Sequence, residues 1–258
     1  MRYLILSIAI LLGLSTTASS GTISKNNPDR LHIEYGAKHK CVLRLVGLIK
    51  KDDATQYSSG SCVIVDPNIA ITAAHAIASV DECFVKNDKD ENISISACVF
   101  PRLFIDNKHD MHKPSYDIAV CYLEKPIQLD FYPRLYDKND ESGKICSMAG
   151  FGVSGIHGSS KTKTDKLRRA GSNIVDGVFD GMLECSFGYG QDTKLEFLIN
   201  SGDSGGGLFI DKKLAGINSS IYKYKGKIYN NSRHTRISMH KDWIESVIKV
   251  LKQNYKEK

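Results

Sequence analysis

The feature that most limits how this chain can fold is a series of short segments rich in β-branched and aromatic residues. They recur between residues 41 and 222, separated by turn residues, and include CVLRLVGLI, DIAVCYLE and KLEFLI. No long helical period lies between them, as a parallel sheet of alternating strands and helices would require. The pattern therefore predicts an all-β protein, built as a sandwich or as a pair of barrels.

Two other segments interrupt this pattern. The stretch over residues 129–144, LDFYPRLYDKNDESGK, is polar and contains a proline, as is typical of a connection between two units. Near the C-terminus, apolar residues recur at helical spacing: Trp243, Ile244, Val247, Ile248 and Leu251. This spacing predicts an amphipathic helix packed on the second half of the protein.

The first 20 residues differ from the rest of the chain. Arg2 is followed by an apolar run over residues 4–14 and then by the small residues STTASSG, an arrangement typical of a secretory signal peptide. The apolar run is short for a membrane span, so a retained anchor is the weaker alternative. We expect cleavage before Gly21, a short propeptide or N-terminal arm over residues 21–32, and a secreted or periplasmic protein.

Charge and composition give no sign of a nucleic-acid partner. The formal net charge is +6, but the basic runs, such as KTKTDKLRR, are not interleaved with aromatic residues. We interpret them as solvated faces or loops. No segment after the signal peptide is apolar enough to cross a membrane, so we expect no membrane partner once the signal is removed.

The chain has seven cysteines, and none is spaced as C-x-x-C, so a zinc site is not expected. Disulfides are permitted in an exported protein. Cys83 and Cys98 flank a polar, hairpin-like stretch, and we predict a bridge between them. Cys62 and Cys121 lie in apolar strand-like runs, where a buried thiol and a bridge remain equal alternatives. The odd count leaves at least one thiol unpaired.

A glycine-rich run over residues 200–209, NSGDSGGGLF, surrounds Ser204 with residues that cannot build a core. Its G-x-S-x-G pattern suits the strand-to-helix elbow of an α/β-hydrolase. It also suits a loop that holds a nucleophilic serine beside its oxyanion donors, or an ordinary turn. The all-β strand pattern counts against the first interpretation.

A serine hydroxyl needs a base to accept its proton and an acid to hold that base in the right tautomer. His75 ends the apolar strand IAITAAH, where an imidazole gains nothing as core filler, and Asp117 begins the strand DIAVCYL. The order along the chain is His, Asp, Ser, whereas an α/β-hydrolase has Ser, Asp, His. His234 and His240 follow Ser204, but they lie in basic and helical contexts.

The motifs ITAAH, YDIAV and GDSGGGL, followed by LAGINSS and HTRISMHKDWI, resemble those of the trypsin/chymotrypsin family of serine proteases. The resemblance implies an all-β fold of two packed six-stranded antiparallel β-barrels with a C-terminal α-helix. We expect a peptidase domain over residues 33–258: a first barrel over about 33–130, a second over about 143–237, and a helix over about 239–253. We expect neither cofactor nor metal, and a monomer that acts on protein or peptide substrates and is open to a protein inhibitor.

The resemblance also implies roles for single residues. His75 would be the general base and then acid, Asp117 the residue that orients it, and Ser204 the nucleophile. The backbone N–H groups of Gly202 and Ser204 would form the oxyanion hole, and Gly202 suits this role because its backbone must approach the substrate closely. Ser219, in the motif INSS, matches a position whose hydroxyl supports the catalytic aspartate.

Asp203 matches the acid that, in this family, pairs with the amino group released by proteolytic activation. A buried carboxylate without a partner is costly. The chain lacks a clear Ile-Val-Gly-Gly segment to supply that amino group. A cut after Arg30 would expose Leu31, and a cut after His32 would expose Ile33. In a third interpretation, removal of the signal peptide is the only processing.

The cysteine pattern departs from the family. The residue after the catalytic histidine and its bridge partner are usually cysteines, but this chain has Ala76 and Gly60 there, so both are absent together. Cys146 and Cys185 match cysteine positions of the family whose usual partners do not occur. The resemblance leaves the pairing of these two open.

The primary specificity pocket follows from the same resemblance. Its floor would be Leu198, and a preference for Lys or Arg would need an acid there. Ile221 would narrow the pocket, and Ser232 would form its third wall. These residues predict a preference for small or medium aliphatic side chains. An acidic preference would follow if Arg233 or His234 turned inward.

The sequence therefore predicts a secreted serine endopeptidase with a restricted, apolar primary pocket. A catalytically silent binding protein could use the same fold if the pocket or the oxyanion loop were collapsed. An esterase is opposed by the residue order and the strand pattern. The richness in Lys, Ile and Asn and the lack of accessory domains favour a bacterial source.

Overall fold

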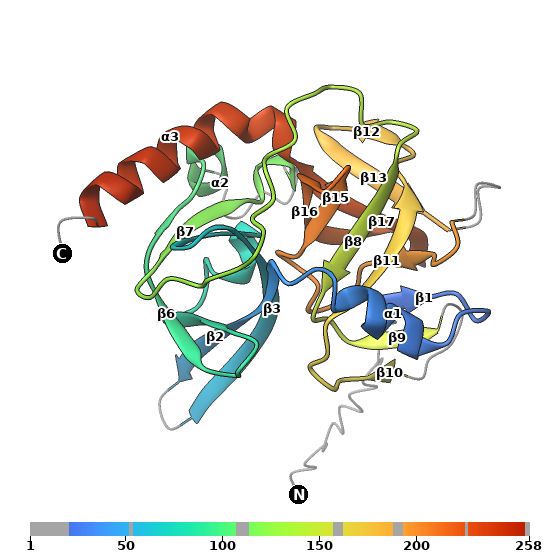
Figure 1. Cartoon of the computed structure of the whole chain (residues 1–258), viewed down its shortest axis with the longest axis horizontal. Coiled ribbons are helices and arrows are strands. Elements are labelled where there is room, and N and C mark those ends of the chain that lie inside the picture. The colour runs from blue at the N-terminus through green and yellow to red at the C-terminus, as the bar shows by residue number, and fades with distance from the viewer. Residues whose placement is uncertain are drawn as a thin grey trace, which may run out of the picture.

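The computed structural model describes residues 21–51, 54–106, 114–156, 162–187, 193–224 and 227–255. The expected signal peptide lies outside these residues. Two β units lie side by side, and a C-terminal helix, α3 (Ile237–Tyr255), runs along one edge of the molecule (Figure 1). Within the described residues, no helix is long and apolar enough to cross a membrane.

The first unit is a closed, six-stranded antiparallel barrel in the order β2-β3-β4-β7-β6-β5. Buried residues such as Leu43 and Leu45 on one strand and Ile64 on its neighbour fill its interior. A short helix, α2 (Arg102–Asp106), follows β6. The strands of the barrel are β2 (Val42–Lys51), β3 (Ala54–Asp66), β4 (Ile69–Thr72), β5 (Glu82–Lys86), β6 (Asn92–Val99) and β7 (Ala119–Leu123).

The second unit is a curled antiparallel sheet of seven strands in the order β11-β8-β15-β16-β17-β13-β12. The all-β, two-unit fold class is thus confirmed, with one difference: the described strands of this unit do not close into a six-stranded barrel. Its strands are β8 (Ile145–Gly150), β11 (Arg169–Ile174), β12 (Gly177–Phe179), β13 (Met182–Ser186), β15 (Gly207–Ile210), β16 (Lys213–Tyr224) and β17 (Lys227–Arg236).

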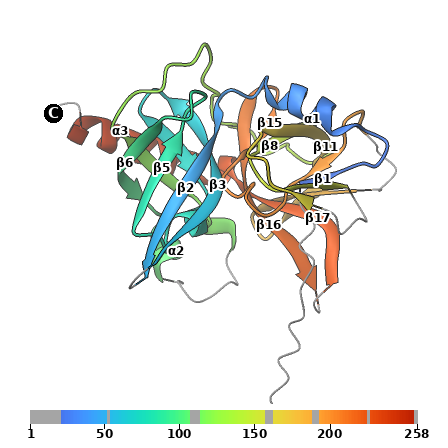
Figure 2. The same ribbon diagram turned by 90° about the horizontal axis from the view of Figure 1, so that it is seen from below.

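The segment after the expected cleavage site is built into this second unit (Figure 2). Strand β1 (Gly21–Ile23) lies between β9 (Ser154–Ile156) and β14 (Phe197–Leu198), and β10 (Thr162–Lys163) completes a four-stranded sheet. Helix α1 (Asp29–Gly36) follows and packs on β11. Asp29, in its first turn, forms paired hydrogen bonds with the guanidinium of Arg169 at 2.6 and 2.8 Å, which tie the helix to the sheet.

Helix α3 packs differently from the expectation that it would lie on the second half. It begins at the end of β17, but its last turns contact the first barrel, where Tyr255 stacks on Tyr122 and Lys252 pairs with Asp66. Its buried residues belong to an apolar cluster shared by both units. The amphipathic face predicted from the sequence therefore covers the junction between the units rather than one of them.

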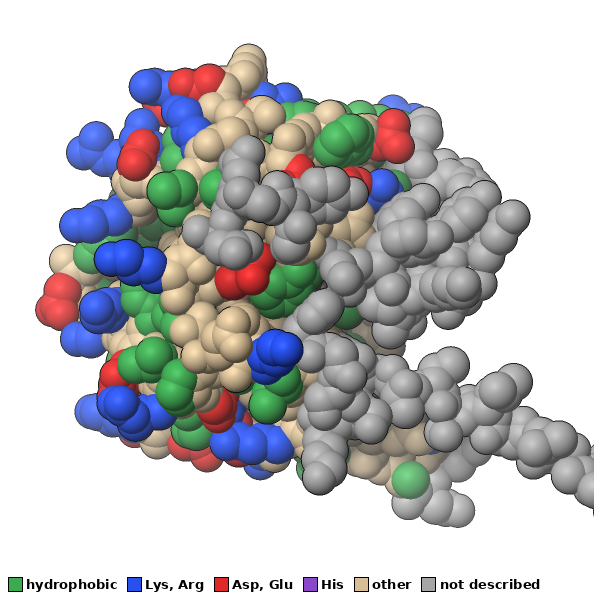
Figure 3. All heavy atoms as spheres, turned by 90° about the vertical axis from the view of Figure 1, so that its right-hand side faces the viewer, with side chains coloured by type: hydrophobic (Ala, Val, Ile, Leu, Met, Phe, Trp, Pro, Cys, Tyr) green, Lys and Arg blue, Asp and Glu red, His purple; other side chains and the backbone are tan. Residues whose placement is uncertain are grey.

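One face of the second unit carries basic side chains interspersed with acidic and apolar ones (Figure 3). Within the second unit, Lys163 and Arg169 both contact Asp165, and Arg236 contacts Glu141. These three basic groups are therefore engaged by carboxylates.

Candidate active site

The expected base and its orienting acid meet at the edge of the first barrel. His75 lies in a 3₁₀ turn (Ala74–Ala76) directly after β4, and Asp117 lies directly after a second turn (Pro114–Tyr116), just before β7. Because β4 and β7 are neighbours in the barrel, their ends bring the two residues together. His75 Nδ1 lies 2.7 Å from Asp117 Oδ2, and the backbone N–H of His75 donates to Asp117 Oδ1 at 2.9 Å.

The second unit also holds Asp117 in place. The hydroxyl of Ser219, on β16, donates to Asp117 Oδ2 at 2.6 Å. The hydroxyl of Thr235, on β17, donates to the backbone carbonyl of Asp117 at 2.9 Å. Ser219 was expected from its motif, but Thr235 was missed because no local pattern marks a residue whose partner lies 118 positions away.

Burial and mutual contact shift the pKa values of this pair in opposite directions. Burial raises the pKa of Asp117, but the hydrogen bonds and charge of His75, together with the Ser219 hydroxyl, outweigh it and leave the pKa below its usual value. Burial lowers the pKa of His75, but the bond to Asp117 and its charge outweigh that and raise it. The side chain of His75 is 48 % exposed. With Nδ1 engaged, Nε2 is left to accept a proton.

Ser204 lies in a tight loop between β14 and β15 that two left-handed glycines shape. Gly202 has a backbone φ of 89° and Gly205 one of 85°, values that residues with a side chain rarely adopt. A Cβ at Gly205 would overlap the carbonyl oxygen of Ser61 and the hydroxyl of Thr72. The glycines of GDSGG are therefore required by backbone conformation and close packing.

Ser61, on β3 of the first barrel, ties this loop to the other unit. Its backbone N–H donates to the carbonyl of Ser204 at 2.8 Å. Its hydroxyl donates to the carbonyl of Gly202 at 3.1 Å and accepts the N–H of Phe151 at 2.9 Å. Sequence reasoning missed Ser61, because its partners lie 141 and 90 positions away and GSC is an ordinary strand segment.

The backbone N–H groups around Ser204 fall into two sets. Those of Asp203, Gly205 and Gly206 donate to backbone carbonyl groups. Those of Gly202 and Ser204 donate to no group in the described part of the chain. Two free donors on either side of Asp203 form the kind of arrangement that can bind an oxyanion.

Gly60, on β3, lies close both to the Ser204 loop and to Ala76, the residue that follows His75. A Cβ built at Gly60 would be 3.2 Å from the carbonyl oxygen of Ser204 and 3.6 Å from Cβ of Ala76. Gly60 and Ala76, which stand where the family carries a bridge, are thus neighbours. Among the contacts of the described residues, Ser204 Oγ makes no hydrogen bond to His75.

Asp203 is buried inside the loop, with 2 % of its surface exposed. Its carboxylate accepts the backbone N–H groups of Gly152 at 2.7 Å and of Asn200 at 2.8 Å. No basic side chain of the described residues forms an ion pair with it. Burial raises its pKa to about 7, because the two N–H groups only partly replace the lost water.

Strand β1, which the sequence did not predict, lies beside the strand that leads into the loop carrying Asp203. Thr22 pairs with Leu198 on β14, and Gly21 pairs with Ser154 on β9. Because β1 and β14 are antiparallel, Gly21 lies next to the residue that follows Leu198, which leads into the Ser204 loop. The residues expected as a propeptide or arm thus border the candidate site.

The three expected pocket residues occupy two places. Ile221 on β16 and Ser232 on β17 are paired directly. Leu198 lies on β14, buried in the apolar cluster that also holds Ile23 and Phe197. No acid stands at Leu198, and its side chain contributes to the core of the second unit.

The two residues that would have favoured an acidic substrate are held by partners inside the protein. The guanidinium of Arg233 forms an ion pair with Glu184 at 2.5 Å. His234 is buried, and burial lowers its pKa to about 3. Its ring bonds to Asn218 at 2.9 Å and to Ser232 at 3.0 Å. Neither residue offers a free positive charge.

The cysteines occur as thiols, and five of them form two groups. In the first barrel, Cys98 Sγ lies 3.0 Å from Cys121 Sγ, directly opposite on the neighbouring strand. Cys83 contacts the same Cys98, so both members of the expected bridge are together. In the second unit, Cys146 Sγ lies 3.8 Å from Cys185 Sγ, and both are buried. Within the described residues, no group of cysteines, histidines and acids is placed to hold a metal.

A histidine–aspartate pair and a glycine-bounded serine at the junction of two β units define a protein of the trypsin-like serine-protease class. The chain belongs to the Trypsin family, because the family model of that name matches residues 50–244. The family predicted from the motifs is therefore confirmed.

Solved structures share the fold at low sequence identity. Neuropsin, a serine protease expressed in the limbic system of mouse brain, is 18 % identical with a TM-score of 0.62, over 81 % of this chain and 95 % of that one. The scabies mite inactivated protease paralogue S-D1 is 16 % identical with a TM-score of 0.63, over 83 % and 94 %. HL collagenase is 14 % identical with a TM-score of 0.60, over 81 % and 94 %. No curated protein matches the chain.

Proposed function

We propose that this protein is a secreted serine endopeptidase that cuts protein or peptide substrates through an acyl-enzyme. His75 Nε2 takes the hydroxyl proton of Ser204 while Ser204 Oγ attacks the scissile carbonyl. Asp117 holds the imidazole and stabilises its positive charge, and the N–H groups of Gly202 and Ser204 bind the oxyanion. His75 then gives the proton to the leaving amine, and water releases the acyl group by the same steps. The enzyme works as a monomer, open to a protein inhibitor and without a cofactor.

The observation that carries this proposal is the pair of unused N–H groups at Gly202 and Ser204. An oxyanion donor of this kind is worth about 2.7–4 kcal/mol of activation free energy. A silent binding protein has no need to keep two such donors free. Two observations favour this alternative of a silent binding protein: an inactivated protease paralogue shares the fold, and Ser204 makes no hydrogen bond to His75. In substrate-free enzymes, however, catalytic hydrogen bonds are often long and tighten only with substrate.

The experiment compares three proteins on a diverse peptide library, with cut sites read by mass spectrometry. These are the mature chain, Ser204→Ala and Ser142→Ala, the last removing an exposed serine on the connection between the units. Cleavage that the Ser142→Ala variant retains and the Ser204→Ala variant loses supports the proposal. Equal cleavage by all three, or none by the mature chain, refutes it.

The primary pocket takes small or medium aliphatic side chains, because the residues expected to border it, Leu198, Ile221 and Ser232, carry no charge. An uncharged residue at Leu198 leaves nothing to bind Lys or Arg. The ion pair of Arg233 with Glu184 and the lowered pKa of His234 leave no cation to bind an acid. Cuts that follow Val, Ala or Leu in the same library support this pocket. Cuts mainly after Lys, Arg, Asp or Glu contradict it while leaving the endopeptidase proposal standing.

Removal of the signal peptide is the only processing step, and the amino group of Gly21 becomes the partner of Asp203. Leu31 and Ile33 lie within α1, so cuts before them would break a helix that Asp29 ties to the sheet. Gly21 instead lies on β1, beside the segment that leads to Asp203. N-terminal sequencing of the exported protein gives Gly21 if this is right, and Leu31 or Ile33 if it is not.

In an oxidising compartment, four of the cysteines form two disulfides. Cys146 joins Cys185, whose Sγ lies 3.8 Å from its own. Cys98 joins Cys83 rather than Cys121, because Cys83 is partly exposed and an oxidant can reach it, whereas Cys121 is buried. Each bridge forms by exchange with an oxidised dithiol protein, which takes up the two protons and two electrons.

A further inference from the structure

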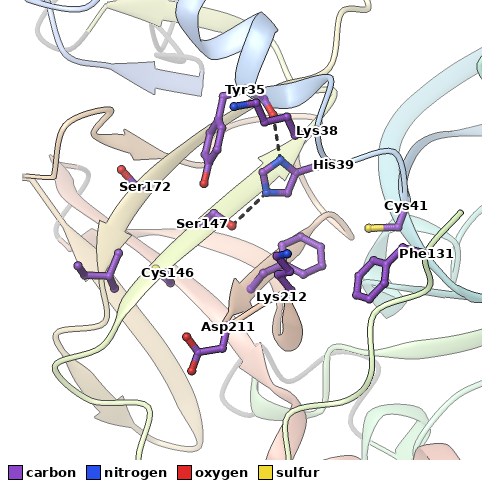
Figure 4. A pocket seen from close by; sticks show the side chains of 12 residues that line it. Tyr35, Lys38, His39, Cys41, Phe131, Cys146, Ser147, Ser172, Asp211 and Lys212 are labelled. Atoms are coloured by element: carbon purple, nitrogen blue, oxygen red, sulfur yellow. Dashed lines mark hydrogen bonds between the residues drawn. The ribbon is translucent and has the colours of Figure 1, made fainter.

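A cavity of about 630 Å³ lies among residues of both the N-terminal segment and β8, and Ser204 is not part of its lining. Figure 4 shows the side chains that line it. Its boundaries are α1 with the segment that follows, the first residues of β8, and the turn between β15 and β16. On β8, Ile145 lines the cavity, whereas Gly150 lies against Asp203. At about 3.3 Å per residue the two ends are about 17 Å apart. The cavity is therefore distinct from the candidate active site.

The walls of this cavity are largely apolar. Phe209 is buried and Tyr35 half-buried along its side, while Phe131 and Ile145 stand at its mouth with 53 % and 68 % of their surface exposed. Large apolar side chains left in water beside a cavity are a common mark of a binding site. The volume lies in the range of pockets that hold small organic molecules.

A histidine and a serine form the polar floor. His39 Nδ1 lies 3.1 Å from the backbone carbonyl of Tyr35, and its Nε2 lies 3.0 Å from Ser147 Oγ. A carbonyl only accepts, so Nδ1 carries the proton and Nε2 accepts from the Ser147 hydroxyl. This pair resembles a nucleophile and its base. Ser147, however, lies in the middle of β8, paired with β11 and β15 on both sides, so no backbone N–H is free beside it to bind an oxyanion.

The remaining polar groups of the cavity are mostly hydrogen-bond donors. The hydroxyls of Tyr35 and Ser172 have no hydrogen-bond partner in the described part of the chain. Lys38 and Lys212 are exposed and form no ion pair with a described carboxylate. In Figure 4, Lys38 extends from the top of the cavity and Lys212 from the turn below it. Asp211 is the one acid in the lining, so the two lysines leave it positive.

We propose that this cavity binds a small organic carboxylate with an aromatic or aliphatic body. The body packs between Phe209 and Ile145, and the carboxylate is held by Lys38, Lys212 and the free hydroxyls. An apolar body alone would leave these donors unused, and an inorganic anion would leave the apolar walls in water. Both a free acid and the C-terminal residue of a peptide offer this chemistry.

Calorimetric titration of the Ser204→Ala protein, which cannot digest itself, tests the proposal with defined probes. We expect saturable binding of 3-phenylpropanoate and at least ten-fold weaker binding of its neutral amide. Lys212→Gln weakens binding of the acid at least five-fold. The matched control Lys249→Gln, an exposed lysine on α3, leaves it unchanged.

A second pair of variants tests the apolar walls. Ile145→Asp places a negative charge at the mouth and abolishes binding of 3-phenylpropanoate, whereas Val250→Asp, at a similarly exposed apolar residue on α3, does not. N-acetylphenylalanine distinguishes the two sources of the carboxylate ligand. If it binds at least five-fold more tightly than 3-phenylpropanoate, the ligand is the C-terminal residue of a peptide. Equal or weaker binding supports a free acid. No saturable binding of either acid, equal binding of the neutral amide, or an equal loss in the control variants overturns the proposal. None of these results depends on proteolysis.

Discussion

The buried carboxylate of Asp203 makes a sharp prediction about how stability depends on pH. Without a cationic partner its pKa in the folded protein is about 7, against about 3.9 for an unfolded aspartate. The folded state then binds the proton more tightly than the unfolded state. The contribution of protonated Asp203 is complete below pH about 4 and is lost as the pH rises to about 7. Three pKa units correspond to about 4 kcal/mol of unfolding free energy.

A free amino group at Gly21 would remove this loss. An α-amino group is positively charged below pH about 8, and an ammonium beside Asp203 would bring the carboxylate pKa back toward its ordinary value. The unfolding free energy of the mature chain should then be nearly constant between pH 5 and 7.5. A chain with extra residues before Gly21 keeps Asp203 unpaired and should lose about 2.5 kcal/mol of unfolding free energy over the same window, because roughly two pH units of it lie below the Asp203 pKa of about 7.

The assay is urea unfolding at several pH values, with both chains in the Ser204→Ala background. Asp203→Asn is the matched control, because it removes the titrating group while keeping most of the side-chain shape. In the chain with extra residues before Gly21, this substitution should make the unfolding free energy nearly independent of pH. Equal pH slopes for the mature and extended chains would refute the pairing with Gly21. A flat profile for both would show instead that Asp203 has an ordinary pKa without any amino group.

Four further predictions concern the candidate site and its surroundings. Ser61→Ala leaves the carbonyl of Gly202 and the N–H of Phe151 without their hydrogen-bond partner, at a cost of about 1–3 kcal/mol each. It should lower kcat/KM by at least ten-fold with a smaller change in KM, measured on the best peptide of the library. Unchanged kinetics would show that Ser61 does not support the site. Gly205→Ala combines a left-handed φ with backbone overlap and should lower the unfolding free energy by more than about 2 kcal/mol in urea. In a plot of kcat/KM against pH, the midpoint of the acid limb should lie above the ordinary histidine pKa, because the carboxylate of Asp117 raises the pKa of His75. A midpoint below the ordinary histidine pKa would contradict this electrostatic account. Peptide mapping of the exported protein under non-reducing conditions should join Cys146 to Cys185, and a Cys146→Ala variant should leave Cys185 open to alkylation after unfolding.

The parts of the site that could be predicted are those carried by local sequence. His75 and Asp117 each stand at the end of a short apolar strand, and Ser204 is surrounded by glycines whose conformations no other residue adopts easily. Each mark extends over fewer than ten residues. The order of the three marks along the chain was enough to identify the family and its two-unit β fold.

The contacts that were missed depend on distant partners. Ser61 and Thr235 look like ordinary strand residues until the two units pack together. Strand β1 has three residues and is stable only because β9 and β14 flank it. Helix α1 is short, and its link to the sheet depends on the pair of Asp29 with Arg169, 140 residues later. Neither periodicity nor turn residues can report such pairings.

The distribution of hydrogen bonds in the Ser204 loop also bears on whether the protein is an enzyme. The loop satisfies the N–H groups of Asp203, Gly205 and Gly206 internally and leaves those of Gly202 and Ser204 free. An unpaired donor near a protein interior lowers stability, so a loop shaped only for folding would be expected to satisfy these two as well. The first unit further braces the loop through Ser61 without using either donor. Such bracing is of use when the two donors must point at a charge that exists only during the reaction.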